Sequence, residues 1–126
     1  MSEHSELSRR VDVIERGYEY LLAYAAQGRQ NDTGSEARQT LMGMRDALDG
    51  LGILVAEAIN SASAAGATDA AGFLDAVRED ARKAHGAIGL VLSRPAISSL
   101  LVDNLNASIH LRALLTDVFL VEQALK

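Results

Sequence analysis

The sequence predicts an all-α protein, an antiparallel four-helix bundle with up-down-up-down order. Apolar residues recur at intervals of three and four in four segments, and no segment shows the period of two that a half-buried strand requires. Helix-favouring Ala, Leu, Glu and Arg are common, and there is one proline. We expect residues 1–126 to form a single domain with one core, with residues 1–4 frayed.

The first helix is expected over residues 5–27. Gly28 follows it directly, and glycine commonly ends a helix because it adopts the left-handed backbone conformation readily. The core side chains are spaced by four and three along this helix, and they are Leu7, Val11, Ile14, Tyr18, Leu21 and Ala25.

The second and third helices are expected over residues 34–62 and 69–92. Thr33 and Glu36 could form a capping box for the second, with Asp32 or Ser35 as alternative caps. Residues 60–69 form a polar loop, and Thr68 or Asp69 opens the third helix. The core stripes of the two helices are Leu41, Met44, Leu48, Leu51, Val55 and Ala58, and then Leu74, Val77, Ala81, Ala84, Ile88 and Val91.

The fourth helix is expected over residues 95–125, after a turn at Ser93–Pro95. Asn104 interrupts its core stripe at a height similar to that of His85. The pair could form a polar tie that fixes helix register, or line a ligand pocket; alternatively, the helix breaks near Asp103–Asn106. The apolar members of the stripe are Ile97, Leu100, Ala107, Leu111, Leu114, Val118, Val121 and Leu125.

Two helices carry a second apolar stripe beside the core stripe. Val13 and Gly17 share one with two tyrosines on the first helix, and leucines with one phenylalanine form another on the fourth. The simplest cover is a second copy of the chain, so we predict a homodimer; the alternative is a monomer with a central fourth helix. The predicted protein interface consists of Tyr20, Tyr24, Leu101, Leu105, Leu115 and Phe119.

Small residues form a further track on the second and third helices. Gly43, Ala47 and Gly50 mark the second, and Gly86 and Gly89 mark the third. A glycine inside a helix costs about 0.5–1 kcal/mol relative to alanine. Such glycines indicate close approach by a neighbour, which is either another helix of the same bundle or a surface from outside.

Composition excludes several classes of function. The chain has no cysteine, which removes disulfides, thiolate metal sites and cysteine nucleophiles. A net charge of −5 disfavours nucleic-acid binding. No apolar run approaches a membrane span, and the N-terminal sequence does not resemble a signal peptide, so we expect a cytoplasmic protein without membrane contact. The Arg- and Ala-rich composition suggests a bacterial source.

The histidines offer little chemistry. A di-iron bundle needs a glutamate three residues before each ligand histidine, but Arg82 and Ala107 precede His85 and His110 at that spacing. We therefore expect no metal and no cofactor. Gly86 and Gly89 after His85 would suit a histidine-phosphotransfer domain, although Ile88 stands where such domains carry a lysine. No serine elbow or phosphate-binding loop is present.

The leading functional hypothesis is a non-enzymatic helical protein that acts by contact, as a homodimeric adaptor, regulator or assembly factor. The main alternative is a small-ligand sensor with a pocket inside the bundle, in which Tyr18, His85 and Asn104 supply the polar contacts. A phosphotransfer role for His85 is the third. The sequence favours no catalytic residue.

Overall fold

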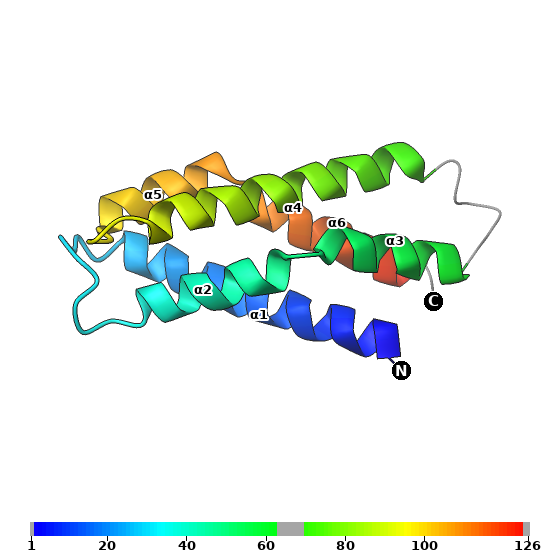
Figure 1. Ribbon diagram of the computed structural model, residues 1–126, viewed down its shortest axis with the longest axis horizontal. Helices are drawn as coiled ribbons and strands as arrows, with labels where there is room; N and C mark the ends of the chain where they lie inside the picture. Colours follow the sequence, from blue (N-terminus) through cyan, green and yellow to red (C-terminus); the bar gives the residue numbers. More distant parts are fainter. Residues whose placement is uncertain (1, 63–69, 125–126) are drawn as a thin grey trace.

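The computed structural model describes residues 2–62 and 70–124, and the regular structure in these ranges is all helical, as predicted (Figure 1). The predicted helix openings at Thr68 or Asp69 lie outside the described residues. The helices are α1 (Ser2–Ala25), α2 (Ala37–Leu48), α3 (Leu51–Ala62), α4 (Ala71–Leu92), α5 (Ser99–Ser108) and α6 (Leu111–Ala124). Residues 2–4, expected to be frayed, form the start of α1.

The second expected helix is broken, so the prediction of one continuous helix over 34–62 is wrong. The helix ends at Leu48 and resumes at Leu51, and between them Gly50 has a φ of +74°. That left-handed conformation suits glycine because other residues meet a steric penalty there. The guanidinium of Arg10 donates a hydrogen bond to the Asp49 carbonyl and so ties the break to α1.

The fourth expected helix is also broken, between α5 and α6. Ile109 has an extended backbone (φ −107°, ψ 156°) and a buried side chain, so the break lies beyond the alternative position predicted at Asp103–Asn106. The buried face of α5 consists of Ser99, Val102 and Leu105. Leu100, Asn104 and Ala107, which were predicted to be core, are exposed.

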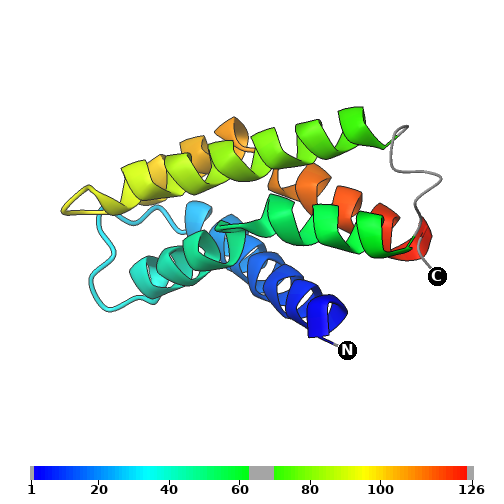
Figure 2. The same ribbon diagram turned by 45° about the vertical axis from the view of Figure 1, so that its right-hand side comes forward.

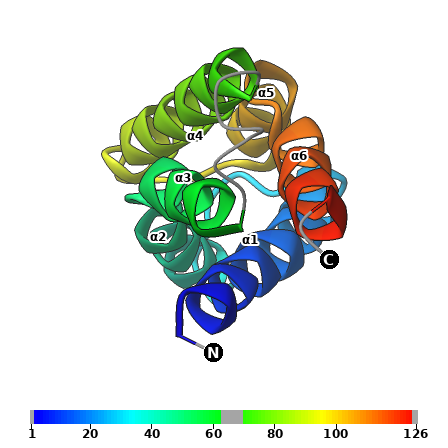
Figure 3. The same cartoon turned by 90° about the vertical axis from the view of Figure 1, so that its right-hand side faces the viewer.

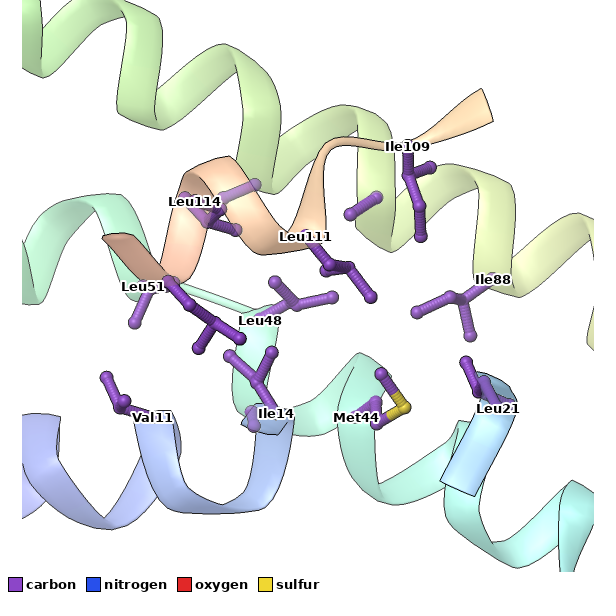
Figure 4. Close-up of a cluster of buried hydrophobic side chains, with 14 of the residues drawn as sticks. Val11, Ile14, Leu21, Met44, Leu48, Leu51, Ile88, Ile109, Leu111 and Leu114 are labelled. Carbon is purple, nitrogen blue, oxygen red and sulfur yellow. The ribbon is translucent and has the colours of Figure 1, made fainter. Parts of the chain in front are cut away.

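All the helices contribute to one apolar core. α1 packs on α2 and α5, while α4 packs on α2, α3 and α5. Figures 2 and 3 show α3 and α6 at the end of the molecule that holds the N-terminal part of α1, and Figure 3 places them on opposite sides of the bundle. In Figure 4, Ile14, Leu48 and Leu51 point toward Leu111 and Leu114, which places both helix breaks around the middle of the core.

Tyr24 belongs to this core, which corrects its predicted place on a protein interface. Its side chain is 0% exposed, and its hydroxyl donates a hydrogen bond to the Ile97 carbonyl at 2.6 Å. The buried Ser99 hydroxyl donates to the Tyr24 carbonyl at 2.7 Å and accepts the Arg29 N–H at 2.8 Å. The start of α5 and the segment after α1 therefore cover the ring that the stripe pattern left uncovered.

A polar cluster joins the segment between α1 and α2 to the turn after α4. One carboxylate oxygen of Asp32 accepts the Ile97 N–H at 2.9 Å, and the other accepts from Arg38 at 3.2 Å. Arg38 also donates to the carbonyls of Leu92 and Arg94 at 3.0 Å each. The Ile97 N–H, with Arg38, lowers the pKa of Asp32 despite its partial burial.

The caps of the helices differ from the predicted ones. The N-cap position of α2 is Glu36, and its side chain makes no capping bond, so none of the predicted caps Thr33, Asp32 and Ser35 holds that position. The Ser35 hydroxyl accepts the Ala37 N–H at 3.2 Å from one residue before the cap. Ser98 caps α5 by accepting the Leu101 N–H at 3.0 Å, three residues beyond the proline expected to open the helix.

Candidate functional surfaces

The three residues predicted to line one ligand pocket lie on different surfaces. Tyr18 lines a cleft beside the break between α5 and α6. His85 lines a groove between α4 and the broken α2–α3 segment. Asn104 is exposed on α5 and borders neither hollow. The predicted pairing of His85 with Asn104 is wrong because α5 turns a different face to the core, as described above.

The α5–α6 cleft has a volume of about 570 Å³ and contains an unusual amide. Asn106 donates from Nδ2 to the Leu21 carbonyl at 3.3 Å, while its buried Oδ1 accepts no hydrogen bond from any described group. A buried acceptor without a donor costs about 1–3 kcal/mol. The cleft is lined by Tyr18, Asn106, Ala107, Ile109, His110, Arg112, Ala113, Thr116 and Asp117.

Asp117 adds a titratable group to the same cleft. Burial raises the pKa of its carboxyl, and repulsion from Asp80 raises it further. The neutral acid can donate a hydrogen bond, which the ionised form cannot. Together with the Asn106 amide, this carboxyl gives the cleft a polar end suited to a small molecule that carries hydrogen-bond donors and acceptors.

A second hollow surface, the α2–α4 groove, follows α4 for several turns. We define it by two separate hollows along α4, of about 250 Å³ and 340 Å³. The first is lined by Leu48, Asp49, Gly50, Leu51, Gly52, Ile53, Arg78, Ala81, Arg82 and His85. The second is lined by Arg38, Met42, Arg45, Gly89, Leu92 and Ser93.

The two hollows lie along the same helix pair because α2 and α4 run antiparallel. Arg38 at the start of α2 bonds to the Leu92 carbonyl at the end of α4, whereas the end of α2 meets His85. His85 and Gly89 lie one helical turn apart on the same face of α4. The two hollows therefore succeed each other along one side of the molecule, the side on which Figure 3 shows α2, α3 and α4.

Positive charge gathers along this groove although the chain is acidic overall. Arg45 and Arg78 make no hydrogen bond or ion pair with any described residue, while Arg82 pairs with Glu79 at 2.8 Å. Asp49 is the acidic residue of the lining. Arg45 and Arg78 thus remain available to an acidic group.

The helix glycines fall into two kinds. A Cβ at Gly17 would lie 2.4 Å from Met44, and one at Gly52 would lie 2.6 Å from Arg78, so these glycines permit close helix contact. A Cβ at Gly43, Gly86 or Gly89 would meet no atom within 4 Å. Of the two explanations that the sequence left open, close approach within the bundle is therefore wrong for the last three.

The remaining predicted interface residues divide between core and surface. Leu105 and Leu115 are 4% and 6% exposed, so the chain itself covers them, which corrects their predicted exposure. Leu101 is half-buried, and Phe119 is 38% exposed beside Leu120. Phe119 on α6 is therefore the most exposed of these four residues.

Tyr20 is the remaining member of the predicted interface. It lines a hollow of about 430 Å³ between α1 and α2, together with Val13 and Gly17. Its hydroxyl accepts the Glu36 N–H at 3.1 Å, and its ring stacks on Tyr24 with centroids 6.1 Å apart. The second apolar stripe on α1 is therefore partly exposed at Tyr20 and fully buried at Tyr24.

Comparison with known proteins gives no relative: no protein-family model matches the chain, and neither the curated proteins nor the solved structures contain a match. Among residues 2–62 and 70–124, no three acidic or histidine side chains are grouped as a metal site would require. None of the helices described is both long enough and apolar enough to cross a bilayer.

Proposed function

We propose that this protein is a non-enzymatic helical interaction protein, an adaptor, regulator or assembly factor built on four antiparallel helical segments, two of them broken. The observation that carries the proposal is the open space above Gly43, Gly86 and Gly89. Glycine destabilises a helix interior, and nothing among the described residues compensates for it there. A partner that approaches the backbone closely would account for these residues.

Of these three glycines, Gly89 lines the α2–α4 groove, and the apolar side chains exposed along that groove support the same proposal. Met42, which lines the α2–α4 groove, is 46% exposed, and Ile53 at the α3 end is 60% exposed. Methionine is common at surfaces that bind other proteins, since its flexible side chain adapts to the partner. A groove with an open glycine and an exposed apolar rim is suited to a helix of another protein.

The proposal is tested by site-specific cross-linking in the native host. A benzophenone amino acid replaces Met42 in the groove, and the same residue replaces Leu100 as the control, because Leu100 is 69% exposed on α5 and lies outside the groove. We expect a defined adduct from position 42 alone, lost when Gly89→Leu fills the groove. Identical adducts from both positions, or none, would contradict the proposal.

Self-association is the second part of the proposal. Phe119 and Leu120 are adjacent on α6 and exposed at 38% and 57%, so a two-fold contact between copies can use them. Sedimentation equilibrium should give a dimer that a Phe119→Asp, Leu120→Asp double variant converts to a monomer with unchanged helix content. A monomeric wild-type protein at tens of micromolar removes this part and leaves the groove proposal intact.

The alternative of a small-ligand sensor is favoured by one observation, the unpaired Oδ1 of Asn106 in the α5–α6 cleft. A ligand that donates a hydrogen bond would satisfy this atom. Native mass spectrometry of protein purified from its own host should then show a bound molecule that Asn106→Leu removes. If both proteins have the mass of the bare chain, the acceptor is a structural defect and the sensor function is rejected.

A further inference from the structure

We infer that the α2–α4 groove binds an acidic amphipathic helix from a partner protein. This inference rests on the proposed interaction function and names the class of partner. Three properties of the groove carry it: unpaired positive charge along its walls, an apolar floor with open space above a glycine, and a length that matches a short helix. Each property restricts the occupant in a different way.

The charge selects an acidic partner. Arg45 projects from α2 and Arg78 from α4, and neither bonds to a described residue, so both can pair with carboxylates. Arg82 is exposed, and its present partner Glu79 is one helical turn away. A surface ion pair of that kind contributes little and is exchanged easily. An acidic helix would therefore meet complementary charge on both walls of the groove.

The apolar floor selects an amphipathic partner rather than a merely acidic chain. Leu48 and Leu51 contribute apolar surface to the first hollow, and Met42 and Leu92 contribute it to the second. Gly89 lies between the walls and leaves space that a side chain of the partner can fill. Apolar residues repeating along one face of a helix fit such a floor, while glutamates on its flanks reach the arginines.

The length of the groove sets the length of the helix. The lining runs along α4 from Arg78 to Ser93. At 1.5 Å per residue this stretch is roughly 22 Å long, which corresponds to about four helical turns of a partner. A helix of about 16 residues would fill it.

A second copy of this chain is the less suitable occupant. Exposed Phe119 and Leu120 make α6 the apolar helix that a copy could offer. However, α6 packs on α4 from the side of the bundle that Figure 3 shows opposite α2 and α3, so it lies away from the groove between α2 and α4. Seating the α6 of one copy in the groove of the next would relate the copies head to tail, and such contacts extend into chains unless the rotation closes them. A separate partner requires no such arrangement.

The test uses the full chain and two synthetic helical peptides of about 16 residues. Both peptides carry the same leucine face, with glutamate on the flanks of one and lysine on the flanks of the other. Fluorescence anisotropy should show that the glutamate peptide binds at least about tenfold more tightly, by an amount that falls with added salt. Amide chemical shifts should change at Met42, Arg45 and Gly89.

Charge reversal provides the matched variants. Arg45→Glu with Arg78→Glu should reverse the preference toward the lysine peptide, whereas Arg9→Glu, at an exposed arginine of α1 that lines neither the groove nor the α5–α6 cleft, should leave it unchanged. If circular dichroism shows that the Glu pair loses helix, Arg45→Gln with Arg78→Gln replaces it, and this pair should remove most of the difference between the peptides. Gly89→Leu should weaken both peptides.

Several outcomes overturn the inference. Equal affinity for the two peptides, or shift changes confined to another surface, excludes an acidic helix in this groove. If the cross-link from position 42 forms in the host but the acidic peptide does not bind, the interaction function stands and the partner class is wrong. If the groove variants abolish a dimer of the chain, the occupant is a second copy and the inference fails.

Discussion

The two kinds of glycine in this molecule occupy similar helical positions but have opposite surroundings. Gly17 on α1 faces the buried side chain of Met44, with no room for another carbon atom. Gly86 and Gly89 on α4 face empty space. The sequence treats the two alike, as small residues on a helix. The contrast shows that α1 and α2 are closely packed at Gly17, whereas the surface of α4 at Gly86 and Gly89 has room for another molecule.

The largest effect is expected at the packed glycine. Gly17→Val would force Met44 out of its position in the core, and overpacking of this kind costs about 1–3 kcal/mol. Gly86→Val is the matched control and should change the free energy of unfolding by less than about 0.5 kcal/mol, because the valine meets open space and has a better helix propensity. Urea denaturation of both variants measures the difference. Equal losses of stability would mean that Gly17 and Gly86 are packed equally closely by their neighbours.

The tyrosines provide the next largest effect. Tyr24→Phe removes a hydroxyl that is bonded to the Ile97 carbonyl inside the protein, and the unpaired carbonyl should cost about 1–2 kcal/mol. Tyr18→Phe alters a hydroxyl that borders the open α5–α6 cleft, and we expect no measurable change in stability. Thermal unfolding followed by circular dichroism compares the two. A greater loss of stability for Tyr18→Phe would show that the Tyr18 hydroxyl, and not that of Tyr24, makes the more important buried hydrogen bond.

The open glycines should respond in the opposite direction from Gly17. Gly86→Ala and Gly89→Ala should each stabilise the free protein by about 0.5–1 kcal/mol, because alanine has the better helix propensity and its methyl group meets no atom. Gly89→Ala should also weaken cross-linking from position 42, whereas Gly86, which lies outside the groove lining, should leave it unchanged. Destabilisation by either alanine would show that some contact already uses the space.

The periodic pattern predicted the first and third segments well because their apolar residues keep one phase from end to end. The second segment misled because Gly50 was interpreted as a small residue inside a helix. Asp49–Gly50 is also a strong turn signal, and the structure places Gly50 in the left-handed conformation that such a turn uses. The sequence therefore contained the information, but the continuous apolar stripe concealed it.

The break between α5 and α6 had no such signal. Neither glycine nor proline stands near Ile109 and His110, and a single phase through both helices places Leu100 and Asn104 inside. One residue of offset rotates a helix face by about 100°, so the break moves Val102 and Leu105 inward instead. The candidate cleft depends on this rotation, which is why Asn106 could not be identified from spacing alone.

The smallest expected effect is a pH-dependent change in stability at two aspartates, Asp117 at the α5–α6 cleft and Asp32 in the polar cluster after α1. Asp117 borders the open cleft, where burial and the nearby Asp80 raise its pKa in the folded protein. Its ionised form therefore opposes folding at neutral pH, and this penalty disappears as the pH falls through the folded pKa toward the unfolded one. Asp117→Asn should slightly raise the free energy of unfolding at neutral pH, and the gain should vanish in acid.

Asp32 in the closed polar cluster is the control of opposite sign. Its pKa is lowered by the Ile97 N–H and by Arg38, so its contribution to stability is present above the ordinary aspartate range and is lost as the pH falls through the folded pKa. Asp32→Asn should destabilise the protein at neutral pH, and its deficit should shrink in acid. Urea titrations of both variants across this range give two differences of opposite sign. If both aspartates stabilise the fold, the Asp117 carboxyl at the α5–α6 cleft is better solvated than its surroundings indicate, and burial does not raise its pKa.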